Sequence, residues 1–141
     1  MDFDENFIQA CFLHGAWAFC AFINQKLAHI TWVAFDEKAK KIVEPWPMKV
    51  DWSSEVCWGN ARTCSTFMRL GLYSCVHAKI GKYLKENGYK KNKFSVKKNN
   101  NPSNIAMSIF QPKVFAYGRK IKILFWQFRI TTNRMEGKVE E

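Results

Sequence analysis

The sequence predicts an α/β (α+β) protein built on a mixed, mostly antiparallel sheet. Two apolar, alternating segments at residues 16–23 and 27–35 flank a short polar turn, which is typical of an antiparallel hairpin. A strand at 55–63, a helix from residue 72 and a strand at 91–98 follow in that order. This succession is typical of a right-handed β-α-β crossover with a central parallel pair.

Length and composition fit one folded domain. The chain has 141 residues, is 48% hydrophobic and contains 6 Trp and 12 Phe, which is enough for a single core. We expect this domain to span residues 1–130 and residues 131–141 to form a flexible tail. The formal net charge of +10 favours an anionic partner, such as a nucleotide cofactor, a nucleic acid or an acidic surface.

The segments after the hairpin are predicted to be irregular until the third strand. Residues 36–41 form a polar connection, and Pro45 and Pro47 exclude a central strand from residues 42–52. Gly59 marks a candidate bulge in the third strand.

The long helix is predicted by apolar side chains that recur at helical spacing, and Gly88 ends it. The apolar stripe consists of Leu72, Val76, Ile80, Tyr83 and Leu84. Asn101 is expected to cap a short helix at residues 103–110. A closing hairpin is expected over residues 113–128, with its turn at Gly118.

The apolar run at residues 7–23 raises the question of a membrane span. Gln9, His14 and Gly15 interrupt it, and it lies at the short limit for spanning a bilayer. Acidic residues precede it where a signal peptide carries positive charge. We interpret it as the end of one element followed by a buried strand, and we expect no membrane association.

The five cysteines predict reduced thiols and a cytoplasmic location. Their number is odd and no CxxC pair occurs. Cys57, Cys64, Cys75 and His77 do not have the spacing of a compact zinc site. We therefore expect buried structural cysteines and no metal.

The start of the long helix is the candidate functional feature. The stretch FMRLGLYSCV, residues 67–76, has Arg69 and Gly71 directly before the helix. A helix N-terminus presents unpaired N–H groups and the positive end of the helix dipole, so it attracts anions. Glycine would let a phosphate approach closely. The alternative is that Gly71 only relieves a tight strand-to-helix turn.

This element order, with RLG opening the long helix and NNNPSNIA opening the short one, resembles the GNAT acetyltransferase family over residues 16–128. In that family a loop of pattern Q/R-x-x-G-x-G/A binds the pyrophosphate of acetyl-CoA through backbone N–H groups. The strand after the helix splays from its neighbour, and the pantetheine arm lies in the gap. A later Asn contacts CoA, and a Tyr can protonate the departing thiolate.

The first motif matches in part. Gly71 matches the middle glycine, whereas Met68 stands at the usual Gln or Arg and Tyr73 at the second small residue. Arg69 supplies a cation one position later.

In the later motif, Asn100 and Ser103 match an N-x-x-S/A pattern, Met107 stands at the position of the Tyr, and Gln111 stands where a glycine usually follows. The cofactor-binding residues that the resemblance implies are Thr63, Arg69, Leu70, Gly71, Leu72, Tyr73, Ser74, Asn100 and Ser103.

The resemblance implies transfer of acetyl from acetyl-CoA, as cosubstrate, to a primary amine. Glu55 is the candidate general base, with Asp51 or a water chain as alternatives. Tyr117 and Tyr73 are the spare phenols that would replace the missing acid. For the acids the alternative is a solvated surface position, and for the phenols it is packing.

Two other functions stay open. The family normally has a strand and one or two helices before the first hairpin, whereas only residues 1–15 precede it here. A truncated or degenerate GNAT-like domain without catalysis would serve as a CoA-binding or interaction module.

A basic nucleic-acid-binding module is the third reading, because residues 79–98 are rich in lysine. The spacing of Tyr83, Tyr89 and Phe94 fits the core stripe better than a stacking surface. The acceptor and the oligomeric state, a homodimer included, stay open.

Overall fold

The computed structural model describes residues 3–123 and 126–133, which form two compact units divided after Ala106. The helices and strands are α1 (Glu5–Leu13), β1 (Trp17–Ile23), β2 (Lys26–Ala34), α2 (Glu37–Val43), β3 (Glu55–Thr63), the 3₁₀ turn η1 (Ser65–Phe67), α3 (Leu72–Glu86), β4 (Lys91–Lys93), α4 (Asn101–Ser108), β5 (Ala116–Ile123) and β6 (Trp126–Asn133). Within the described ranges, every helix is too short or too polar to cross a lipid bilayer.

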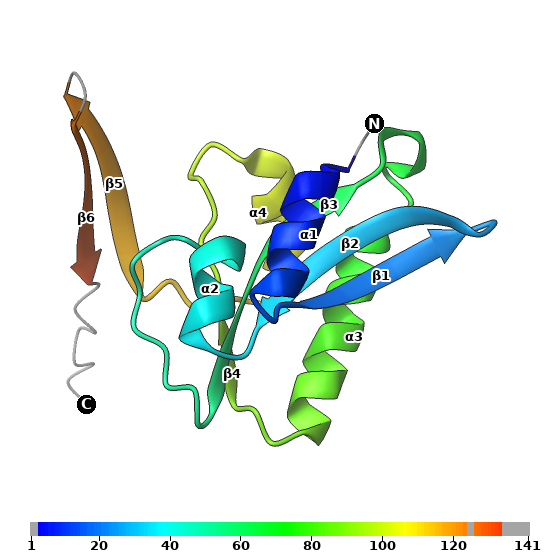
Figure 1. Cartoon of the computed structure of the whole chain (residues 1–141), viewed down its shortest axis with the longest axis horizontal. Coiled ribbons are helices and arrows are strands. Elements are labelled where there is room, and N and C mark those ends of the chain that lie inside the picture. Colours follow the sequence, from blue (N-terminus) through cyan, green and yellow to red (C-terminus); the bar gives the residue numbers. More distant parts are fainter. Residues whose placement is uncertain (1–2, 124–125, 134–141) are drawn as a thin grey trace, which may run out of the picture. The chain divides into compact units, whose positions relative to one another are not determined.

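The first unit is organised around a four-stranded sheet in the order β1-β2-β3-β4 (Figure 1). β1 pairs with β2 and β2 with β3 in antiparallel fashion, whereas β3 and β4 are parallel. The left-handed backbone of Asn24 and Gln25 makes the tight turn of the first hairpin. The mixed, mostly antiparallel sheet with one parallel pair is therefore confirmed. The predicted central position of that pair is wrong, because β4 is the last strand in the order and lies at the edge of the sheet.

Helices cover both faces of this sheet, with α1 and α2 on one face and α3 on the other (Figure 1). The core under α1 and α2 includes Cys11, Ala16, Ile30, Trp32, Ala34, Ala39, Val43 and Cys57. Val76, Ile80 and Leu84 are the buried apolar stripe of α3, as the spacing predicts. β2 is buried on both faces of the sheet. Its successive side chains therefore point alternately into two packed layers, one on each side of the sheet.

A bulge interrupts β3 just after Gly59. Trp32 lies opposite Gly59 and Ile30 lies opposite Arg62, so β3 carries one extra residue between these pairs. Asn60 adopts a left-handed backbone at this point. Gly59 itself is needed for close packing, because a Cβ there would collide with the backbone carbonyl of Val43.

The predicted polar connection at residues 36–41 is wrong, because α2 covers most of it. Asp36 caps this helix by accepting a hydrogen bond from the Ala39 N–H at 2.8 Å. Ala39 and Val43 are buried and attach the helix to the core. The charged residues of this segment leave the helix with a single narrow apolar face, so its sequence pattern does not indicate a helix.

Two boundaries near the parallel pair also differ from the prediction. β4 is only three residues long, so Phe94 and Val96, which the prediction placed in a strand over residues 91–98, lie outside it. The residue before α4 is Asn100, whose carbonyl accepts the Asn104 N–H at 3.0 Å. Asn100 also accepts the Ser103 N–H through its side chain, so it takes the capping role predicted for Asn101.

The second unit contains the antiparallel pair β5–β6. Gly118 lies inside β5, opposite Thr131, so the predicted turn at Gly118 is wrong. The connection between the strands falls at residues 124–125, outside the described ranges. β6 extends to Asn133, which moves residues 131–133 from the predicted tail into a strand, and residues 134–141 lie outside the described ranges.

Candidate functional site

The connection from β3 to α3 contains two left-handed residues. After Thr63 the chain makes the turn η1, and Arg69 and Gly71 then adopt φ values of 65° and 71°. A Cβ at Gly71 would meet no heavy atom within 4 Å. Gly71 is therefore favoured by its backbone conformation, and the space above it is open.

The N-terminus of α3 is uncapped. Gly71 occupies the N-cap position without a side chain, and the first turn contains no acidic residue. The first helical hydrogen bond runs from the Cys75 N–H to the Gly71 carbonyl at 3.0 Å. The N–H groups of Leu72, Tyr73 and Ser74 consequently have no acceptor within the helix, which is the arrangement that attracts an anion.

Tyr73 directs its side chain toward the sheet. Its ring stacks on His77 with centroids 4.1 Å apart and meets His29 edge-on at 5.9 Å. Burial raises the pKa of Tyr73, and a hydrogen bond with the side chain of Ser103 partly offsets this increase. The ring is therefore fixed from both sides, and the phenol stays protonated at neutral pH.

The hydrogen bond between the side chains of Tyr73 and Ser103 joins the two segments that the sequence singles out separately. Tyr73 lies in the first turn of α3, and Ser103 lies in the first turn of α4. Asn100 precedes α4 and is exposed, and Asn104 ties the chain before α4 to the helix through the carbonyls of Lys97 and Lys98. The two helix N-termini are thus connected.

His29 is a fully buried polar residue beneath the site. Its Nδ1 lies 2.7 Å from Oγ1 of Thr63, and its Nε2 lies 2.8 Å from Oγ1 of Thr31. Burial lowers the pKa of His29 to about 4, and the charge of His77 adds to this effect. His29 is therefore neutral at physiological pH and holds the end of β3, where the loop begins.

His77 is the second buried imidazole. Its Nδ1–H donates to the Tyr73 carbonyl at 2.7 Å, and its ring meets Trp58 edge-on at 4.7 Å. Burial lowers its pKa, and the hydrogen bond to Tyr73 offsets this only in part. His77 is therefore buried in the packing of α3 and supports Tyr73.

Glu55 lies at the other end of β3 from the loop. About eight strand steps separate it from Thr63, or roughly 26 Å. Its carboxylate pairs with Lys93 at 2.6 Å and Lys91 at 3.8 Å and accepts the Asp51 N–H. Burial raises its pKa, but the Asp51 N–H and the two lysines outweigh burial and hold it below its ordinary value.

The remaining predicted residues occupy several environments. Thr63 is tied to His29, Leu72 and Ser74 are half-buried in the first turn of α3, and Arg69 and Leu70 are exposed. Asp51 is exposed, and hydrogen bonds from the side chain and N–H of Ser53 lower its pKa. Tyr117 belongs to β5 in the second unit and is 61% exposed.

The cysteines differ in burial more than the sequence predicted. Burial raises the pKa of Cys57 to about 12, so this thiol stays protonated. Cys64 is half-buried, and Cys20 and Cys75 are exposed, which corrects the expectation that the cysteines are all buried. Among the described residues, no group of three or more His, Cys, Asp or Glu side chains is arranged to hold a metal ion.

Comparisons with known proteins add no identification. No protein-family model matches the chain, and a search of curated proteins gives no match. The function is therefore argued from the arrangement at the start of α3.

Proposed function

We propose that the chain is a GNAT-like N-acyltransferase that transfers acetyl from acetyl-CoA to a primary amine. The observation that carries this proposal is the uncapped N-terminus of α3, which follows β3 after the turn η1 and a short loop. The N–H groups of residues 72–74 are the proposed donors to the pyrophosphate of CoA. Arg69, exposed beside them, supplies a cation.

The short pairing of β3 with β4 supports a place for the pantetheine arm. Their pairing covers only residues 55–57 of β3, whereas β3 continues to Thr63. Residues 58–63 thus extend beyond the described pairing with β4, and we propose that the pantetheine arm pairs with this part of β3 as an extended chain does. The bulge at Asn60 reorients the backbone within this stretch.

Tyr73 is compatible with this proposal although it stands where the family has a small residue. The ring of Tyr73 lies against His29 and His77, and its hydroxyl is hydrogen-bonded to the side chain of Ser103. A large side chain at this position therefore does not cover the N–H groups at the helix N-terminus.

The proposed reaction needs few protein groups. The neutral amine attacks the thioester carbonyl, the tetrahedral intermediate forms, the C–S bond breaks, and the CoA thiolate takes up a proton. Glu55 is engaged by Lys93 and lies far from the loop, so we assign removal of the amine proton to water. This replaces Glu55 as the preferred base.

Two measurements test the proposal. Calorimetric titration with acetyl-CoA should show saturable binding that is tighter than that of ATP or 3′-dephospho-CoA. Release of free CoA thiol in the presence of a panel of primary amines should then depend on both substrates. Absence of acetyl-CoA binding in a sample with native near-UV circular dichroism would refute the proposal. Binding without turnover would instead support the non-catalytic CoA-binding module.

A further inference from the structure

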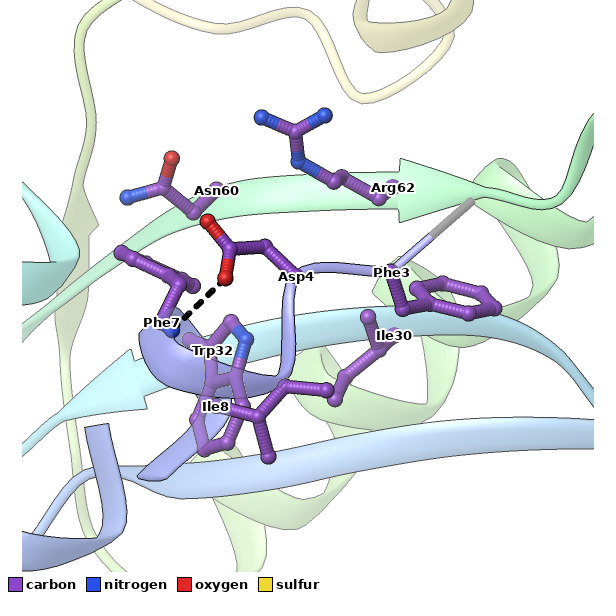
Figure 2. Close-up of a pocket in the computed structure, with 8 residues that line it drawn as sticks. All are labelled: Phe3, Asp4, Phe7, Ile8, Ile30, Trp32, Asn60 and Arg62. Carbon is purple, nitrogen blue, oxygen red and sulfur yellow. Dashed lines mark hydrogen bonds between the residues drawn. The ribbon is translucent and has the colours of Figure 1, made fainter. Parts of the chain in front are cut away.

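A small pocket lies on the face of the sheet that α1 covers, opposite the face that packs against α3. Its volume is about 80 Å³ (Figure 2). It lies between the start of α1, the middle of β2 and the part of β3 around the bulge. A pocket of this size selects small molecules.

One side of the pocket is apolar. This wall consists of Phe3, Phe7, Ile8, Ile30 and Trp32 (Figure 2). Trp32 is only 1% exposed, and its ring is held edge-on by Phe7 at 6.4 Å and Phe12 at 5.1 Å. The Trp32 and Phe7 rings of the wall are therefore held in place, and the wall would accept a short hydrocarbon group.

The other side carries one acid, one base and an amide, namely Asp4, Arg62 and Asn60 (Figure 2). Oδ1 of Asp4 caps α1 by accepting the N–H groups of Asn6 at 3.0 Å and Phe7 at 3.2 Å. The second carboxylate oxygen points to the side of the pocket where Asn60 and Arg62 lie (Figure 2).

Asp4 and Arg62 are not paired with each other. The ion pairs that the structure gives for its described residues join Lys82 to Glu86 and two lysines to Glu55. The pocket rim thus offers one negative and one positive group, both exposed and both able to accept a partner.

We propose that this pocket binds a small zwitterion, an α-amino acid with an apolar side chain. Arg62 would receive the carboxylate, Asp4 the ammonium group, and the apolar wall the side chain. A simple amine would leave Arg62 unneutralised, and a simple acid would leave Asp4 unneutralised. The inference rests on the proposed function only in that the bound amino acid would be the acetyl acceptor.

Calorimetry with the whole chain tests the proposal directly. The probes are L-leucine, 3-methylbutylamine, which lacks the carboxylate, and 4-methylpentanoate, which lacks the ammonium group. L-Leucine is expected to bind about fivefold tighter than either analogue, the size of one exposed ion pair. Equal affinity for L-leucine and the amine, or no binding of L-leucine, would overturn the inference.

Matched variants distinguish the loss of a contact in the pocket from the effect of changing the net charge of the chain. Arg62→Met and Asp4→Asn should each weaken L-leucine binding about fivefold, and asparagine preserves the helix cap. Arg119→Met, on β5, and Asp36→Asn, at the cap of α2, make the same changes elsewhere and should leave the affinity unchanged. Equal losses in the pocket variants and these controls would exclude the proposed site.

The experiment separates this inference from the proposed function because the titration contains no acetyl-CoA. L-Leucine binding by a chain that does not bind acetyl-CoA would support the pocket and refute the acetyltransferase. Acetyl-CoA binding by a chain that does not bind L-leucine would refute the pocket alone.

Discussion

The hydroxyl of Tyr73 and the side chain of Ser103 are hydrogen-bonded, which connects the first turns of α3 and α4. The same tyrosine stacks on His77, one helical turn further along. The first turn of α3 is thus anchored to α4 through Ser103 and to the sheet through His29. We regard this anchoring as the reason why the helix N-terminus presents its N–H groups in a fixed arrangement.

Tyr73→Phe removes this hydrogen bond and keeps the stacked ring. We expect the free energy of unfolding to fall by about 1 kcal/mol. A double-mutant cycle with Ser103→Ala in denaturant unfolding should give a coupling energy of about 0.5–1.5 kcal/mol. Tyr89→Phe, whose ring packs on Phe35, is the matched control. Zero coupling would show that the two side chains act independently.

Gly71→Glu should weaken acetyl-CoA binding at least about tenfold, because it adds a negative side chain beside the proposed phosphate position. Gly88 gives a matched control at the other end of α3, since it is also left-handed and has open space. Both variants should lose about 1 kcal/mol of stability, because both force a side chain into this conformation. Similar acetyl-CoA affinities in the two variants would place the phosphate elsewhere.

Gly59→Ala tests the packing of α2 against the bulge of β3. The new methyl group would collide with the Val43 carbonyl, and we expect a loss of about 1–3 kcal/mol in urea unfolding. Gly81→Ala is the control, because a Cβ there meets nothing within 4 Å in the middle of α3. That variant should gain about 0.5–1 kcal/mol, and a similar loss in both would contradict this explanation.

The buried imidazole of His29 predicts loss of stability in mild acid. Its pKa is about 4 in the folded chain, against 6.5 for the ordinary group, so only the unfolded chain takes up the proton between these values. The free energy of unfolding should therefore fall as pH decreases from about 6.5 to about 4, by roughly 3 kcal/mol. Unfolding curves of His29→Gln should show a smaller decrease, and an identical decrease would contradict this role.

Much of the fold follows from local patterns. The apolar residues of the hairpin β1–β2, the strand β3 and the helix α3 recur with a clear strand or helix period. The structure contains these elements where that period predicts them. The helix α2 was missed because it is short and charged, although Asp36 is an acceptable cap. Gly118 was misread as a turn because glycine inside a strand gives the same local signal.

The site was predictable only where its residues are adjacent in the chain. Gly71 and the N–H groups after it could be read from the sequence of one loop. The contact of Tyr73 with Ser103 and that of His29 with Thr63 depend on how distant segments pack. The chemical type of Glu55 and its place in a strand favour a general base, whereas its ion pair with Lys93 depends on how β3 and β4 pair.

The central claim is that the N-terminus of α3 binds the pyrophosphate of acetyl-CoA. The most direct measurement is an ¹⁵N–¹H correlation spectrum of the labelled chain during titration with acetyl-CoA. We predict that the largest saturable shifts occur at the amides of Leu72, Tyr73 and Ser74. Saturation with unchanged amides at these three residues, or no shifts at all, would contradict the claim.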